Sequence, residues 1–146
     1  MLLKKECFTV FFLVSCIIIH AQSDSLRLVC PLSNGTPRII RASDKDYGKT
    51  SEYGVMLTSK TDSLVRAVHE GTIVTVTRSE DTKYDILIQH RGYYFWVAGV
   101  ISPRVKTNQQ IKSGDTIGTY TPGEFLELLI YYHEEPINPR KYLKCL

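Results

Sequence analysis

Short apolar runs follow one another along this chain from Tyr53 onward, and their spacing constrains the fold more than any other feature. They are separated by Gly, Asp, Ser, Asn or Pro at intervals of about ten residues. The segments 72–77 and 84–89 alternate apolar and polar residues, which is the period of a half-buried strand. No segment keeps a 3.6-residue period, and the one helical turn that we expect lies at 138–142. This pattern predicts an all-β fold, an antiparallel sandwich or a barrel-like sheet.

The composition is that of a single globular domain. The chain has 146 residues, of which 43% are apolar and 23% charged. These values exclude a disordered chain and a chain that is membrane-embedded throughout. The net charge is +3, and no basic stripe with interleaved aromatic residues is present. We therefore expect no nucleic-acid partner.

The first 21 residues have the parts of a secretory signal peptide. A basic pair, Lys4 and Lys5, precedes an apolar run from 7 to 19, and Ala21 is a small residue before a polar stretch. The apolar run is short for a membrane anchor. We expect cleavage after Ala21, a lead segment over 22–30, and one β domain over 31–146. The mature protein would then be periplasmic or secreted, without a stable transmembrane segment.

Cys16 offers an alternative fate for the same segment. Leu13 to Cys16 has the Leu-x-small-Cys form of a lipid-attachment site, so the protein could be a lipoprotein anchored at Cys16. Against this alternative, the apolar run continues past the cysteine through Ile19.

Cys30 and Cys145 are the two cysteines that remain after cleavage, and they lie near the two ends of the mature chain. Exported proteins meet an oxidising compartment, and the termini of one domain often lie close together. A disulfide between the two is therefore one expectation, and two free thiols are the other.

Several segments occur in an order that resembles the lysostaphin-like peptidoglycan metalloendopeptidases. They are YGVML, SLVRAVHEGTIVTV, ILIQH with GYYFWVAGV, VKTNQQIKSGDTIGTY and FLELLIYYHEEPINPRKYL, which together extend from about Pro31 to Leu143. The pattern Lys-x-Gly-Asp-x-Ile-Gly within the fourth segment is the most specific of them. The resemblance implies the duplicated hybrid motif fold, whose core is antiparallel β structure.

The residues that would perform the family's chemistry are replaced. Enzymes of this family bind one zinc ion through a His-x-Gly-Ile/Val-Asp motif and a His-x-His motif, and a Tyr-x-His motif supplies a further histidine. On this resemblance the two ligand positions of the first motif fall on Glu52 and Met56, and the middle histidine falls on Gly99. The last motif falls on Phe125 and Glu127, which share one face of a strand. We therefore expect no zinc and no hydrolysis by the family mechanism.

Other side chains offer alternative sites in the same region. Glu52 and Glu127 could face each other across the former metal position, where they would bind a cation or share hydrogen bonds. A hydrolase with a rearranged site could draw only on Ser51, Glu52 and His90. The histidines His69, His90 and His133 show no ligand spacing in the sequence and are expected to be surface or capping residues.

Aromatic residues would remain to line a cleft in a protein without the reaction. The candidates are Tyr53, Tyr94, Trp96 and Tyr131. In the run 93–96, Tyr94 and Trp96 share one face, and the sequence leaves open whether that face points outward. The leading hypothesis is a non-catalytic domain at the bacterial cell envelope that binds peptidoglycan peptides or regulates a cell-wall hydrolase. An active endopeptidase with a rearranged site and a purely structural envelope domain are the alternatives.

Overall fold

The structure, a computed structural model, describes residues 26–38 and 54–145. The expected signal peptide, Cys16, Ser51, Glu52 and Tyr53 lie outside the described residues. In the described part of the chain, no helix is long and apolar enough to cross a membrane.

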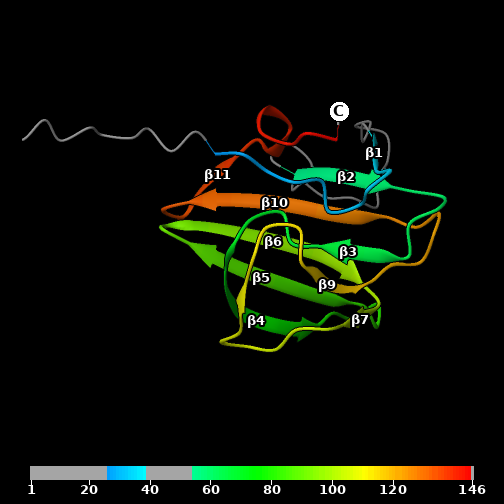
Figure 1. The fold of residues 1–146 in the computed structure, drawn as a ribbon, viewed down its shortest axis with the longest axis horizontal. Coiled ribbons are helices and arrows are strands. Elements are labelled where there is room, and N and C mark those ends of the chain that lie inside the picture. Colours follow the sequence, from blue (N-terminus) through cyan, green and yellow to red (C-terminus); the bar gives the residue numbers. More distant parts are fainter. Residues whose placement is uncertain (1–25, 39–53, 146) are drawn as a thin grey trace, which may run out of the picture.

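The expected all-β fold is confirmed, and Figure 1 shows a large antiparallel sheet with a small sheet against it. The strands of the large sheet, in spatial order, are β1 (Thr36–Arg38), β2 (Gly54–Thr58), β10 (Leu126–Tyr132), β6 (Tyr93–Val100), β5 (Tyr84–His90), β4 (Gly71–Arg78) and β8 (Gln110–Ile111). β11 (Glu135–Ile137) pairs with the second half of β10. The small sheet has the order β3 (Leu64–Arg66), β9 (Thr116–Thr119) and β7 (Ser102–Pro103).

One face of the large sheet forms the core, because alternate residues of its central strands are apolar. Phe95 and Val97 of β6, Ile86 and Ile88 of β5, and Leu128 of β10 are completely buried. They belong to the same apolar cluster as the small-sheet residues Val65 and Ile117. The residues between them on each strand therefore lie on the opposite face of the large sheet, which we call the outer face.

Tight turns fix the register of the central strands. Arg91 and Gly92, between β5 and β6, both have positive φ values of 45° and 84°. His133 and Glu134, between β10 and β11, have φ values of 45° and 70°. Positive φ at both central residues is the geometry of the type I′ hairpin turn, whose twist matches that of the flanking strands.

The helical turn expected at 138–142 is present as the short 3₁₀ helix η2 (Pro139–Lys141). Before it, His133 and Glu134 form a turn, and the short strand β11 begins at Glu135. Pro136 is compatible with β11 because this strand pairs with β10 on one side only. A proline has no N–H to donate to a second neighbouring strand, and it is therefore tolerated at a sheet edge.

The two ends of the described chain meet. Cys30 and Cys145 form a disulfide, with their Cα atoms 5.1 Å apart. Leu28 forms a parallel bridge with Leu143, and both side chains are buried. Of the two expectations, a disulfide or two free thiols, the structure has the disulfide.

Candidate functional site

One row of residues crosses five adjacent strands on the outer face of the large sheet, from β2 to β4. Met56 of β2 lies opposite Glu127 of β10, and Glu127 lies opposite Ala98 of β6. Ala98 in turn lies opposite Asp85 of β5, and Asp85 opposite Thr77 of β4. We call these five residues the central row. Two positions expected for metal ligands, Met56 and Glu127, are therefore direct cross-strand neighbours.

The donors of this pair do not fit a zinc ion. Met56 offers a thioether and is only 5% exposed, while Glu127 is half-buried and offers one carboxylate. Zinc sites in proteins are built from thiolate, imidazole and carboxylate ligands, with three protein ligands even where a water completes the site. Across the described residues, no group of three His, Cys, Asp or Glu side chains is arranged to hold a metal.

The backbone conformation at position 99 requires a glycine. Tyr84 pairs with Val100 and Asp85 with Ala98, so Gly99 is the extra residue of a β-bulge. Its φ of +99° is disfavoured for residues with a side chain, and a Cβ atom here would lie 2.7 Å from the carbonyl oxygen of Phe125. A histidine at position 99 is incompatible with this backbone. Gly99 and Phe125, two expected catalytic positions, are thus in contact distance but contribute no proton-transfer group.

Among the described residues, Asp85 is the carboxylate whose charge raises the pKa of Glu127. Burial raises the pKa of Glu127, and the negative charge of Asp85 raises it further. The pKa of Asp85 is also raised, mainly by burial and in part by Asp81, against a lowering hydrogen bond from Trp96. The expected partner of Glu127 was Glu52, which lies outside the described part of the chain. The sequence analysis did not select Asp85.

Three of the four expected aromatic cleft residues lie on the outer face. Phe95 is completely buried, so Tyr94 and Trp96 point outward, which answers the question that the sequence left open. Tyr131 of β10 lies directly opposite Tyr94. Trp96 is 39% exposed, a large value for an indole in the middle of a sheet. Tyr53, the fourth, is not among the described residues.

The histidines are arranged differently from the expectation. His69 and His90 are 21 positions apart in the sequence, yet their ring centroids lie 4.7 Å apart. The β4–β5 hairpin causes this proximity, because it pairs Thr72 with Gln89 and so brings the flanking residues together. His69 also stacks on Phe95, with centroids 5.2 Å apart, and its Nδ1 lies 2.9 Å from the carbonyl oxygen of Glu70. The two rings pack within an aromatic cluster, remote from the central row along the strands.

The sequence model of peptidase family M23 matches residues 50–139. The chain belongs to peptidase family M23. The family expected from the ordered segments is thereby confirmed.

Solved structures show the same fold. A chain of the SpoIIQ–SpoIIIAH pore-forming complex superposes with a TM-score of 0.64 at 18% identity, over 81% of this M23 domain's chain and 91% of that chain. Csd3 from Helicobacter pylori gives 0.62 at 21% identity, over 82% of this chain and 33% of Csd3. The antimicrobial peptidase lysostaphin from Staphylococcus simulans gives 0.53 at 21% identity, over 63% and 42% of the two chains. A search of curated proteins found no match.

The substitution Glu127→Gln is expected to stabilise this M23 domain at neutral pH. Because the pKa of Glu127 is raised in the folded state above its ordinary value of 4.5, folding disfavours the ionised form. The penalty is absent below pH 4.5, where both states are protonated, and it is complete once the pH exceeds the folded-state pKa. We expect a gain of about 0.5 kcal/mol at pH 7 that vanishes near pH 4.

Urea unfolding at several pH values measures this effect. In an Asp85→Asn background the gain from Glu127→Gln should shrink, because one source of the raised pKa is removed. A gain that is equal at pH 4 and pH 7 would contradict the assignment to charge.

Proposed function

We propose that this M23 domain is a non-catalytic binding domain of the bacterial cell envelope whose ligand is the peptide part of peptidoglycan. The observation that carries the proposal is that Met56 and Glu127, on which the sequence resemblance places two metal-ligand positions, are cross-strand neighbours. A buried thioether beside one carboxylate does not assemble a zinc-activated water. The bulge at Gly99 supports the proposal, because its backbone does not accommodate a histidine.

The rest of the outer face supports a binding role. Tyr94, Tyr131 and Trp96 combine flat apolar rings with polar edges, and such residues suit contact with peptides. Asp85 and Glu127 add negative charge in the middle of this aromatic surface. In this proposal the protein is exported and acts in the periplasm or outside the cell.

A protein ligand is the second candidate. One similar fold occurs in a complex between two proteins, SpoIIQ and SpoIIIAH, so the same face could dock onto an envelope protein such as a cell-wall hydrolase. Binding to purified peptidoglycan, which contains no protein partner, separates the two candidates.

Co-sedimentation with purified peptidoglycan sacculi tests the proposed function. We expect the protein to sediment with sacculi equally well with and without a metal chelator, and to release no soluble fragments. Lysostaphin acting on staphylococcal sacculi is the positive control for fragment release. Release of fragments that the chelator blocks would overturn the non-catalytic assignment, and a protein that stays in the supernatant would overturn the peptidoglycan ligand.

A further inference from the structure

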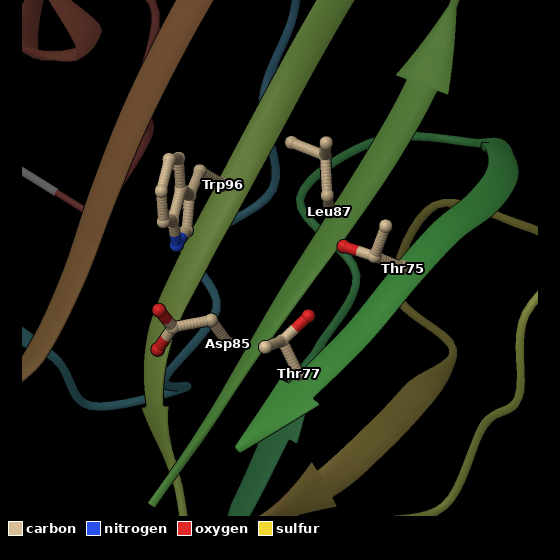
Figure 2. A pocket seen from close by; sticks show the side chains of 5 residues that line it. All are labelled: Thr75, Thr77, Asp85, Leu87 and Trp96. Atoms are coloured by element: carbon tan, nitrogen blue, oxygen red, sulfur yellow. The ribbon is translucent and has the colours of Figure 1, made fainter. Parts of the chain in front are cut away.

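A pocket of about 180 Å³ lies on the outer face next to the central row. Its lining comes from three adjacent strands and comprises Thr75, Thr77, Asp85, Leu87 and Trp96. Figure 2 shows the two threonines on β4, Asp85 and Leu87 on β5, and Trp96 on β6. Binding sites for whole small ligands usually span about 300 to 1,000 Å³. This pocket therefore has the size for one side-chain group of a larger ligand.

The indole of Trp96 forms one wall of the pocket and is held in place. Its N–H donates a hydrogen bond to the Asp85 carboxylate, and in Figure 2 the indole nitrogen points toward that carboxylate. Trp96 also lies opposite Leu87 across β5 and β6. Although it is held from two sides, the indole remains 39% exposed, so its ring is available to a ligand.

The pocket is negatively charged, and the nearest lysine in the sequence pairs with other carboxylates. Asp85 and Glu127 act on each other as like charges, separated by one intervening strand. The nearest lysine in the sequence, Lys83, is paired with Glu124 and lies 4.0 Å from Asp81. In the described part of the chain, neither Asp85 nor Glu127 has a basic partner that would neutralise it.

These features together select a cation with a short apolar stem. A carboxylate attracts an ammonium group and forms a charge-assisted hydrogen bond with it. The face of an indole is the best aromatic surface for a cation. The hydroxyl groups of Thr75 and Thr77 can accept the remaining ammonium protons, and Leu87 offers apolar contact to a methylene stem.

We propose that the Asp85–Trp96 pocket binds the primary ammonium group at the end of a lysine-type side chain in a peptide ligand. The inference rests on the proposed function only in placing the pocket on a peptide-binding face. The inference names the chemical group that the domain would recognise. It also places the binding pocket on β4, β5 and β6, beside the positions on β2 and β10 where the resemblance implies replaced ligands.

The fluorescence of Trp96 provides a direct test, because Trp96 is the single tryptophan of the chain. The probe is the tripeptide acetyl-Ala-Lys-Ala-amide, and its matched control carries the same lysine acetylated at the side-chain nitrogen. We expect a saturable fluorescence change with the first peptide and none with the second. Glycine amide, whose amine has no apolar stem, should bind at least several-fold more weakly than the probe.

Substitution of Asp85 tests the proposed contact. Asp85→Asn, which keeps the side-chain shape, should weaken binding of the probe about tenfold, since the charge-assisted hydrogen bond is lost. Glu135→Gln removes an exposed carboxylate of β11 and should leave the affinity unchanged. Thermal unfolding of both variants verifies that they are folded.

Three results would overturn the inference: no saturable change with the probe, an equal response to the acetylated control, or unchanged affinity in folded Asp85→Asn. Failure of the proposed function is distinguishable from these results. Binding of the probe without any retention on sacculi would overturn peptidoglycan as the ligand while supporting the amine pocket. Retention on sacculi by a protein that ignores the probe would overturn the amine pocket alone.

Discussion

Removing the disulfide by the double substitution Cys30→Ala and Cys145→Ala is expected to lower the free energy of unfolding by about 4 kcal/mol. The two cysteines are separated by 115 positions, so the bond closes almost the whole described chain into one loop. Closing so long a loop removes much of the conformational freedom of the unfolded chain, and the stabilisation grows with loop length. The loss is a large fraction of the stability of an ordinary domain.

The same change also releases a structural contact in the folded state. Leu28 and Leu143 form a β-bridge that joins the two terminal segments. It is the one isolated bridge among the described residues. Both side chains are buried in the core beside the disulfide. Without the covalent bond, the N-terminal segment would still be held by this bridge, by the hydrogen bond from the N–H of Val29 to the carbonyl oxygen of Val68, and by the pairing of β1 with β2.

Urea unfolding of the protein and of the double variant, with and without a thiol reductant, measures the effect. The reductant should shift the unfolding midpoint of the parent protein to that of the double variant and leave the double variant unchanged. A midpoint that is equal in parent and variant under oxidising conditions would show that the bond contributes nothing.

Met56→Asp, which introduces the ligand type that the sequence resemblance implies for this position, is expected to destabilise the protein by about 3 kcal/mol. Met56 is 5% exposed, so the new carboxylate would be buried. It would also lie directly opposite Glu127, whose own pKa is already raised by burial and by Asp85. Burying a carboxylate beside another half-buried carboxylate is among the costlier substitutions.

Thermal unfolding of Met56→Asp with and without added zinc measures this cost and tests its cause. Met56→Leu, a volume-conserving change, should cost less than about 1.5 kcal/mol and serves as the control. We expect zinc to leave the unfolding temperature of Met56→Asp unchanged. A large increase on adding zinc would mean that the remaining side chains complete a metal site, contrary to the proposed function.

Local patterns predicted most of the fold because each strand carries its own signal. The alternation in 84–89 predicted β5, and the same alternation correctly placed Ile86 and Ile88 on one face. Glu127 was selected through the resemblance, which places the last motif on Phe125 and Glu127, and in β10 it is a polar residue among apolar neighbours. β11 is too short to predict from the sequence, because a three-residue strand with a proline has too little pattern to be distinguished from a turn.

The candidate site was predicted only in part, because its neighbours come from strand register. Asp85 lies two strands away from Glu127, and its relevance depends on Ala98 between them. The bulge at Gly99 shifts the register of β5 against β6. A glycine within a strand can mark a bulge, but it does not give the register that results. The proximity of His69 and His90 could have been found by pairing the β4–β5 hairpin explicitly.

The zinc content of the purified protein tests the central claim most directly. The protein would be incubated with excess zinc, desalted and analysed for metal per polypeptide, with lysostaphin treated in parallel. We expect a ratio near zero, since Met56 and Glu127 do not form a zinc ligand set. A ratio near one would contradict the account and identify this member of family M23 as a metalloprotein.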